Sequence, residues 1–244
     1  MQKTFTAPFR IQSSQTDFNS RLRPGALLQM MQEVAGGHAE KLGVGHHLLL
    51  EKGVVWVLTR IEVRMERYPA FGENIQIETF PMPNRRWFFP RYFIFRDEAG
   101  QQIGCASSMW VLLDVKERRM CPPEAAIDLI PNNFDLTPPM GPPSAVALAG
   151  GEPICTERIP VYSDLDLNGH VNNTRYLDWC CDALGVDAMA EYELSRFALN
   201  FSQEIRPGQQ VLTELRRDGD AFSFSGFVDG ARHFDVGGTL SPRQ

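Results

Sequence analysis

A proline-rich stretch near the middle of the chain limits the possible folds more than any other feature. Of the 17 prolines, eight fall between Pro122 and Pro153, and such a segment can hold neither a helix nor a central strand. On each side of it the sequence runs in the same order: a turn, an amphipathic helix, and then strands with period-two alternation. We therefore expect a tandem repeat, with domains at residues 1–121 and 154–244 and a linker at 122–153.

The first half predicts one long helix followed by an antiparallel sheet. Pro24 suits the first position of a helix, apolar residues recur after it at three- and four-residue spacing, and Gly43 suits its end. A long connection is expected to follow, including residues 48–56. Residues 60–66 then alternate polar and apolar, which is typical of a strand with one buried face. Further strands are expected at residues 74–80, 91–96 and 107–114.

The second half repeats this order around a more apolar helix. Residues 174–184 leave only a narrow polar stripe, so this helix must be nearly enclosed. Residues 60–78 align with residues 196–214 at an offset of 136, with the same apolar phase. Each half therefore predicts an antiparallel sheet wrapped around a helix, an α+β fold. The strands of the second half are expected at residues 197–204, 210–216, 222–228 and 233–240.

Composition excludes several classes of function. The chain is 43% hydrophobic and 22% charged, as globular proteins are. Its net charge of −6 argues against nucleic-acid binding, and no apolar run approaches the about 20 residues of a membrane-spanning helix. Five cysteines suit neither a disulfide framework nor a C-x-x-C metal pair, and the N-terminus lacks a secretory signal. We expect a cytoplasmic protein without membrane insertion, metal or cofactor, and a homodimer is one option for its oligomeric state.

The segment before the second helix, residues 163–173, is the most unusual in the chain. It contains two carboxylates, three amides and one imidazole directly before an enclosed apolar helix. A capping turn is the simpler interpretation, because Asn and Asp favour turns and N-caps. A cap does not need a histidine, however, and polar groups this dense beside an apolar helix tend to be desolvated and to have shifted pKa values. The helix N-terminus also offers free N–H groups that can stabilise an oxyanion.

The run Asp166-x-Asn168-x-His170-Val171-Asn172-Asn173-x-x-Tyr176-x-x-Trp179 resembles the signature of the acyl-acyl carrier protein thioesterases. Residues 56–60 and 67–73 resemble the strand and turn of that family. The resemblance implies two hotdog domains in tandem that hydrolyse the thioester of fatty acyl-acyl carrier protein and release a free fatty acid. The second-half run is also similar to that of acyl-CoA thioesterases, so hydrolysis of acyl-CoA stays an alternative. A hotdog protein that binds acyl ligands without catalysis is another.

The resemblance also implies a set of catalytic residues, which by position are Asp166, Asn168, His170 and Glu204. Without it, Glu204 reads as a solvated charge at a strand end. Plant members often carry a cysteine directly after this glutamate, where this chain has Ile205. Because isoleucine has no nucleophilic atom, we expect a water activated by Glu204 or His170. N–H groups at the start of a helix at Asn172 and Asn173 are expected to hold the oxyanion.

The repeat suggests that the first half lacks these acid–base groups. At the offset of 136, Tyr68 stands in the place of Glu204. At a second offset of 147, which places Asp17 over Asp164, the positions of the other catalytic residues fall on Asn19, Arg21 and Arg23. Family precedent then assigns the acyl chain to the first half. The candidates for its tunnel are Met30, Met31 and Trp56, for which ordinary core packing is the simpler reading.

The carrier-protein partner is acidic, so a docking site needs local basic residues. The best cluster is Arg85, Arg86 and Arg91, and the alternatives are residues 116–119 and 216–217. Solvated surface charge is the simpler interpretation of each.

Overall fold

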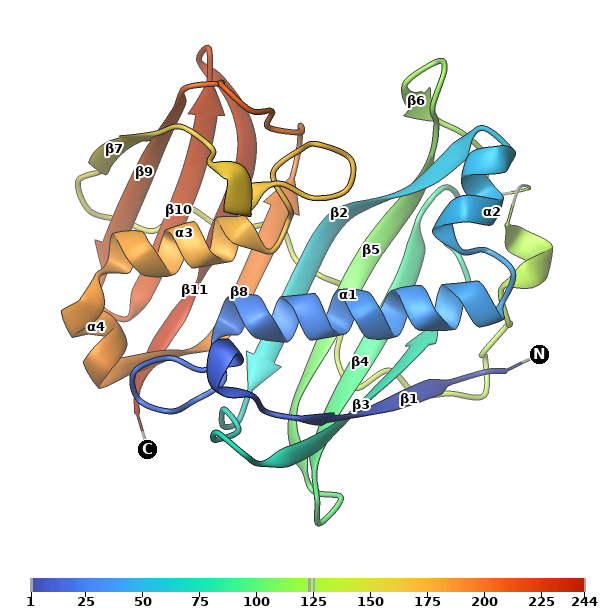
Figure 1. The fold of residues 1–244 in the computed structure, drawn as a ribbon, viewed down its shortest axis with the longest axis horizontal. Helices are drawn as coiled ribbons and strands as arrows, with labels where there is room; N and C mark the ends of the chain where they lie inside the picture. Colours follow the sequence, from blue (N-terminus) through green and yellow to red (C-terminus); the bar gives the residue numbers. More distant parts are fainter. Residues whose placement is uncertain (1, 123, 125, 244) are drawn as a thin grey trace.

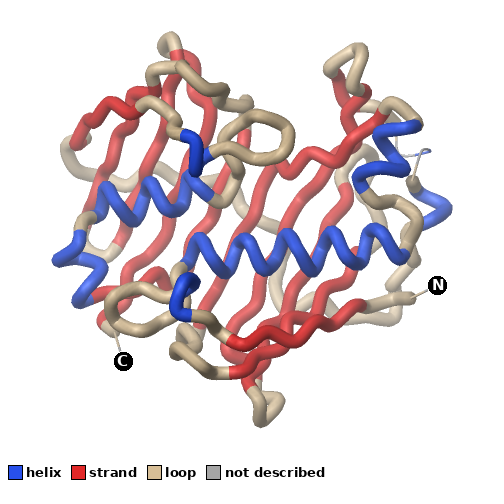
Figure 2. Tube along the Cα trace, viewed as in Figure 1, coloured by secondary structure: helices blue, strands red, loops and turns tan. Residues whose placement is uncertain are grey.

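The computed structural model describes residues 2–122, 124 and 126–243. Met1, Pro123, Ala125 and Gln244, which the expected domains and linker include, lie outside the described residues. The strands form one antiparallel sheet of 11 strands, in the order β1-β3-β4-β5-β2-β8-β11-β10-β9-β7 with β6 paired to β5. Figures 1 and 2 show that the sheet curves around two helices, α1 and α3, which lie end to end on its inner face.

The first half contains α1, the longer of the two helices on the inner face of the sheet. Its elements are β1 (Phe5–Arg10), η1 (Ser13–Gln15), α1 (Pro24–Lys41), α2 (His46–Glu51), β2 (Val54–Met65), β3 (Asn74–Pro81), β4 (Phe89–Asp97), β5 (Gln102–Asp114) and β6 (Arg119–Met120). The predicted long helix is confirmed. The expected connection at residues 48–56 is wrong in part, because β2 already begins at Val54. Its continuous apolar run hides the alternation by which strands are recognised.

The second half repeats the arrangement around a shorter helix. Its elements are β7 (Ile154–Arg158), η4 (Tyr162–Asp164), α3 (Arg175–Leu184), α4 (Val186–Glu191), β8 (Tyr192–Phe201), β9 (Val211–Asp218), β10 (Ala221–Val228) and β11 (Ala231–Pro242). The strand expected at residues 197–204 ends early, at Phe201. The N–H groups of Ser202 and Gln203 both donate to the carbonyl of His233, at 2.9 and 3.1 Å, so the regular ladder stops there.

Strands β2 and β8 join the two halves into one sheet. They pair antiparallel, with Arg60 opposite Asn200 and Arg64 opposite Arg196. One core cluster extends across the junction, from Met31 of α1 to Trp179 of α3. Helix α3 is enclosed as expected, and its Tyr176 ring stacks on Phe234 with centroids 4.1 Å apart. The end of α1 and the start of α3 therefore share one interior.

The proline-rich segment crosses the outer face of the sheet. The short helix η3 (Ile127–Leu129) lies in its described part. Met140 is buried against Phe80 and Tyr92, and the N–H of Ser144 donates to the buried carboxylate of Glu62 at 3.0 Å. Because Tyr92 and Phe93 are adjacent in a strand, this face is the one opposite to α1. Among the described residues, no helix is long and apolar enough to cross a bilayer.

Candidate active site

The segment that leads into α3, residues 164–173, folds into a tight loop that we call the entry loop. Leu165 and Val171 form an isolated antiparallel bridge, and the N–H of Asp166 donates to the carbonyl of His170 at 2.8 Å. The Asp166 carboxylate accepts the N–H of Asn168 at 2.8 Å and that of His170 at 3.3 Å. Asp166 is therefore committed to the backbone of the loop, where it fixes the direction from which the His170 side chain leaves.

Asp164 ties the entry loop to α3, a role that the sequence did not reveal. Its buried carboxylate accepts hydrogen bonds from the Trp179 indole at 3.1 Å and from Arg175 at 3.2 Å. Its other oxygen accepts the N–H of Val161 at 2.8 Å. Since every one of these donors lies on or next to the loop and helix, Asp164 holds the loop against α3.

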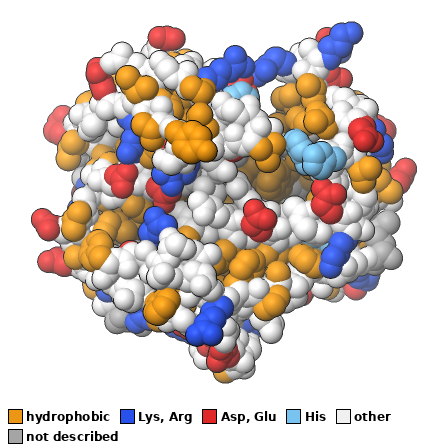
Figure 3. Space-filling model, in the orientation of Figure 1, with side chains coloured by type: hydrophobic (Ala, Val, Ile, Leu, Met, Phe, Trp, Pro, Cys, Tyr) orange, Lys and Arg blue, Asp and Glu red, His pale blue; other side chains and the backbone are white. Residues whose placement is uncertain are grey.

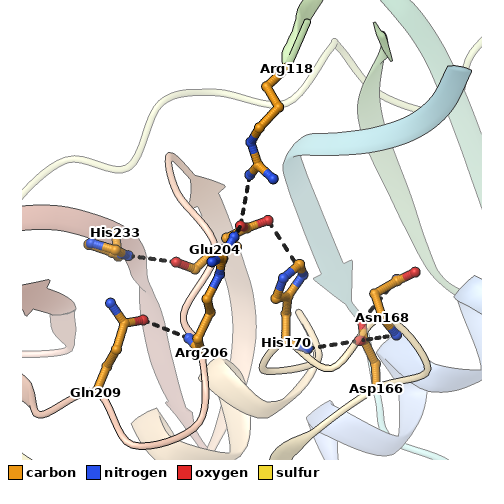
Figure 4. A network of polar contacts seen from close by, with 8 residues as sticks. All are labelled: Arg118, Asp166, Asn168, His170, Glu204, Arg206, Gln209 and His233. Carbon is orange, nitrogen blue, oxygen red and sulfur yellow. Dashed lines mark hydrogen bonds and ion pairs between the residues drawn. The ribbon is translucent and has the colours of Figure 1, made fainter. Parts of the chain in front are cut away.

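The structure brings His170 and Glu204 together. His170 Nδ1 lies 3.4 Å from Glu204 Oε2, as Figure 4 shows. The two residues come from different segments, which are joined by the hydrogen bond from the N–H of Val171 to the carbonyl of Ile205 at 2.8 Å. His233 adds a further restraint, because its Nδ1 lies 3.0 Å from the Glu204 carbonyl oxygen. Asn168 stays at the surface, with its side-chain nitrogen 3.5 Å from Asp166.

Two arginines hold the Glu204 carboxylate from the other side. Arg118 donates to Glu204 Oε1 at 2.7 Å, and Arg206 donates to the same oxygen. Burial raises the pKa of Glu204, but the hydrogen bonds from Arg206 and Arg118 outweigh it and hold the pKa below 4.5. Glu204 is therefore an ionised carboxylate at neutral pH and a weak base.

Arg118 reaches this carboxylate from the first half of the molecule, where it lies in the turn between β5 and β6 (Figure 4). In the sequence it is one member of a charged run, and nothing in the spacing of that run points to a partner 86 residues away. Arg206 follows Glu204 by two residues. Only for Arg206 did the sequence indicate a contact with Glu204, because the two residues lie close together in the chain.

Helix α3 begins at Arg175, so the expectation that it starts at Asn172 and Asn173 is wrong. The Asn172 side-chain oxygen accepts hydrogen bonds from both the N–H and the hydroxyl of Thr174, each at 2.9 Å. The backbone N–H of Asn172 donates to the carbonyl of Asp164 at 2.8 Å. Within the described part of the chain, the N–H of Asn173 has no protein acceptor. Of the two predicted oxyanion residues, Asn173 alone offers a free backbone donor.

An apolar hollow opens beside Asn173 and is visible in Figure 3 as a recess with orange walls. The hollow is shallow and partly open to solvent. Met31 and Met30 both belong to the buried core, but Met31 alone of the two lines the hollow, and Trp56 packs edge-on against Phe89 in a separate cluster. The lining residues are Leu28, Met31, Gln32, Leu58, Ile61, Phe93, Ser108, Trp110, Asn173, Thr174 and Phe201.

The predicted basic cluster of Arg85, Arg86 and Arg91 does not form one surface patch. Arg85 and Arg86 are exposed in the turn between β3 and β4. Arg91 instead turns inward, where its guanidinium lies 3.2 Å from His38 Nδ1 and donates to the hydroxyl of Thr79 at 3.3 Å. Burial lowers the pKa of Arg91 to about 10. Arg91 alternates with the buried Phe93 and Phe95, and this period-two pattern was the signal for its inward direction.

The cysteines lie outside this network. Cys180 is buried in the core, and burial raises the pKa of its thiol and that of Cys181 far above the usual range. Ile205, which directly follows Glu204 and has no nucleophilic atom, is fully buried. Within residues 2–122, 124 and 126–243, no three His, Cys, Asp or Glu side chains lie close enough to hold a metal ion.

The first half contains a matching entry loop at residues 15–24, and its predicted alignment with residues 164–173 needs correction. In the first half, Asp17 Oδ1 accepts the N–H of Asn19 at 2.9 Å and that of Arg21 at 3.0 Å, as Asp166 does for Asn168 and His170. The offset of 147 is therefore wrong, because these hydrogen bonds place Asp17 over Asp166, which is an offset of 149.

Comparison with known proteins gives consistent results along nearly the whole chain. Residues 2–127 match the family described as "Acyl-ACP thioesterase N-terminal domain", and residues 152–229 match "Acyl-ACP thioesterase C-terminal domain". The chain is 27% identical over 213 residues to a chloroplastic palmitoyl-acyl carrier protein thioesterase of Gossypium hirsutum, covering 82% of this chain and 52% of that protein. It is 26% identical over 225 residues to oleoyl-acyl carrier protein thioesterase 2 of Arabidopsis thaliana, covering 82% and 59%. The chain thus spans about half the length of the curated relatives that it matches.

Solved structures confirm the tandem hotdog fold. An acyl-ACP thioesterase from Bacteroides thetaiotaomicron superposes with a TM-score of 0.89 at 24% identity, covering 98% of each chain. The 12:0-ACP thioesterase from Umbellularia californica superposes with a TM-score of 0.84 at 21% identity, again covering 98% of each chain.

Proposed function

Because the chain belongs to the acyl-ACP thioesterase family, we propose that it hydrolyses the thioester of fatty acyl-acyl carrier protein and releases a free fatty acid, as a step of fatty acid synthesis. The observation that carries this proposal is the His170–Glu204 pair, at 3.4 Å, on the loop whose Asn173 lines an apolar hollow. The arrangement supplies a base, an oxyanion donor and a site for an alkyl chain.

His170 is the better placed base of the two. With the proton on Nδ1, directed at Glu204 Oε2, the lone pair of Nε2 is free on the far side of the ring. Glu204 keeps its negative charge, because the hydrogen bonds from Arg206 and Arg118 lower its pKa, so it has little tendency to take a proton. Its charge instead orients the imidazole and stabilises the imidazolium that forms, which is the role of the carboxylate in Ser-His-Asp triads.

The reaction then follows with a complete proton balance. His170 Nε2 takes a proton from a water whose oxygen attacks the thioester carbonyl carbon, and the carbonyl oxygen becomes an oxyanion held by the N–H of Asn173. Collapse of this intermediate breaks the carbon–sulfur bond, and the imidazolium returns the proton to the leaving thiolate. Asn168 positions the water or the carbonyl, and Asp166 keeps the loop in place.

The first half supplies the acyl site in this proposal, and the second half the chemistry. Met31 of α1 and Leu58 of β2 line the hollow together with Asn173, so the alkyl chain lies in the first half when its thioester meets the entry loop. The cytoplasmic location is part of the same proposal. All five cysteines are free, which is compatible with a reducing compartment.

Release of free thiol from acyl-acyl carrier protein and from acyl-CoA of the same chain length tests the activity. Wild-type turnover of the protein-borne substrate is the expected result, and turnover of acyl-CoA alone would assign the other carrier. Saturable binding of acyl ligands without thiol release would instead support the non-catalytic alternative.

Single turnover in heavy-oxygen water tests the mechanism. Attack by water places the label in the fatty acid and leaves Glu204 unlabelled. A Glu204 nucleophile would form an acyl-enzyme anhydride, and attack of water on its glutamyl carbonyl would place the label in Glu204 and leave the fatty acid of that turnover unlabelled.

A further inference from the structure

The hairpin formed by β5 and β6, residues 114–120, has a rigid tip that carries positive charge. Asp114 Oδ1 accepts the N–H of Lys116 at 2.9 Å and that of Glu117 at 2.8 Å, and Arg118 closes the turn at a φ of 51°. All residues from Val115 to Met120 are exposed. These hydrogen bonds fix the backbone of the tip, which projects outside the body of the sheet (Figure 1).

This hairpin stands at the edge of the candidate active site. Arg118 bridges the gap to Glu204 at 2.7 Å, and Arg206 continues the basic surface on the other side. Figure 3 shows lysine and arginine side chains in a row along this edge, above the recess. The hairpin and the segment after Glu204 carry four basic residues, Lys116, Arg118, Arg119 and Arg206, against three acidic ones, Asp114, Glu117 and Glu204. This surface is locally positive on a chain with a net charge of −6.

The hairpin also exposes apolar side chains, which points to a protein rather than a small anion. Val115 is 43% exposed and Met120 is 49% exposed, next to the basic residues. Protein interfaces combine apolar contacts with a charged rim, whereas a phosphate site needs donors alone.

The other basic clusters are less suitable. Arg85 and Arg86 lie in the turn between β3 and β4, which contributes no contact to the Glu204 network among the described residues. Arg216 already donates to the carbonyl of Gly151 at 2.9 Å. Neither cluster lies in contact with the catalytic carboxylate, whereas the hairpin does.

We propose that the β5–β6 hairpin is the surface on which the acidic carrier protein docks. This proposal rests on the proposed function, since it names the partner surface of the same site. Docking at residues 114–120 brings the acyl-bearing arm of the carrier directly to the entry loop and the hollow. Positive charge at the rim also steers an acidic partner during diffusional encounter and is screened by salt.

Charge reversal with two substrates tests the proposal. Lys116→Glu combined with Arg119→Glu is expected to lower kcat/KM for acyl-acyl carrier protein by about tenfold at low salt, because rim charges act mainly on the association rate. The same variant is expected to hydrolyse the acyl-pantetheine thioester, which has no protein to dock, at the wild-type rate. The matched control is Arg85→Glu with Arg86→Glu, which is expected to leave both reactions unchanged.

Binding of fluorescently labelled carrier protein, followed by anisotropy, measures docking separately from turnover. Weaker binding by the hairpin variant supports the proposal even if the wild type releases no thiol, in which case the proposed function fails by itself. Equal loss of both reactions in a folded hairpin variant would overturn the proposal, as would loss of carrier binding in the Arg85 and Arg86 variant alone.

Discussion

The two entry loops of this molecule have nearly the same backbone and opposite chemical capacities. In the first half, Thr16 and Leu22 form the bridge that Leu165 and Val171 form in the second. The N–H of Leu22 donates to the carbonyl of Pro69 at 2.9 Å, as that of Val171 donates to Ile205 at 2.8 Å. The hydrogen-bonded scaffold is therefore common to both halves, and it does not by itself confer reactivity.

The difference lies in two side chains. Where the second half has His170 and Glu204, the first half has Arg21 and Tyr68. Tyr68 is buried and donates to the carbonyl of Leu194 at 2.8 Å, and burial raises its pKa well above 10. An arginine and a buried phenol cannot exchange protons near neutral pH. The two loops share a hydrogen-bonded backbone, and the side chains at these two positions determine whether a proton can be transferred there.

The C-terminal segment occupies the first-half loop as well. Arg243 donates to the second carboxylate oxygen of Asp17 at 2.7 Å and to the carbonyls of Met189 and Tyr192. In the second half, the carboxylate at the matching position, Asp166, has the exposed Asn168 beside it. The first-half loop is thus filled by protein groups, and the second-half loop faces solvent.

Replacing His170 is expected to have the largest effect on activity. His170→Ala removes the proposed base, and His170→Arg gives the loop the residue of its first-half counterpart. Both should lower kcat toward the upper end of the about 10²–10⁴-fold range for a positioned base, measured as thiol release on folded protein. Arg21→His is the control and should leave kcat unchanged, because Tyr68 offers no carboxylate to its imidazole. Near wild-type turnover by His170→Ala would contradict the assignment.

Glu204→Gln should come next, with a loss of about 10²-fold in kcat. The amide preserves the shape of the side chain but removes the charge that stabilises the imidazolium. Glu152→Gln, an exposed and chemically identical change elsewhere, serves as the control. If Glu204→Gln retained wild-type kcat, Glu204 would be the solvated strand-end charge of the simpler interpretation. The difference between Glu204 and Tyr68 would then not explain a difference in activity between the two halves.

Arg118→Gln should produce a smaller loss and a shift in pH dependence. Arg118 and Arg206 hold the pKa of Glu204 below 4.5, so the active ionised form persists above that pKa and is lost as the pH falls through it. Removing one donor raises this pKa, so the loss of activity that comes with protonation of Glu204 is expected to begin at higher pH. Arg118→Lys, which keeps the charge, should restore most of the wild-type profile. An unchanged acidic limb in Arg118→Gln would show that the contact does not control Glu204.

Substitution of the hollow should alter chain-length preference more than chemistry. Met31→Phe adds volume to the wall, so kcat/KM for the longest accepted chain should fall by about tenfold relative to shorter chains, since one methylene is worth about 1–3 kcal/mol. Met30→Phe is the matched control, because Met30 packs in the core and not in the hollow. It should lower the melting temperature and leave the chain-length profile unchanged. The reverse pattern would place the acyl chain elsewhere.

The smallest effect on turnover is expected from the cysteines. A variant with Cys105, Cys121, Cys155, Cys180 and Cys181 replaced by alanine should keep kcat within about twofold, because no thiol belongs to the proton path of the proposed mechanism. Thermal unfolding should show a loss of stability from Cys180, which is buried in the core, and from Cys181, which is partly buried against it. Restoring both of these separates packing from chemistry. Loss of thioester hydrolysis in a folded variant would reinstate a cysteine mechanism.

The sequence by itself determined the elements whose signals are local. Helix α1 follows from the spacing after Pro24, most strands follow from alternation, and the tandem repeat follows from the order of these signals around the prolines. The candidate catalytic motif was also predicted from the sequence, through its resemblance to a known family, because Asp166, Asn168 and His170 lie within one short run of residues. Signals of this kind depend on neighbours a few residues apart, which the sequence shows directly.

Tertiary structure decided what depends on distant contacts. Only the pairing of β2 with β8 brings Arg118 to Glu204, and only the hydrogen bonds of Asp17 set the true alignment of the two loops. The sequence identity between the two halves is low, and a loop has no alternating apolar pattern that could be matched between them. The alignment of the two loops was therefore wrong by two residues. The direction of Arg91 was legible from the strand period, whereas the charge state of Glu204 was not. It results from burial and from two arginines that only the folded chain brings to one oxygen.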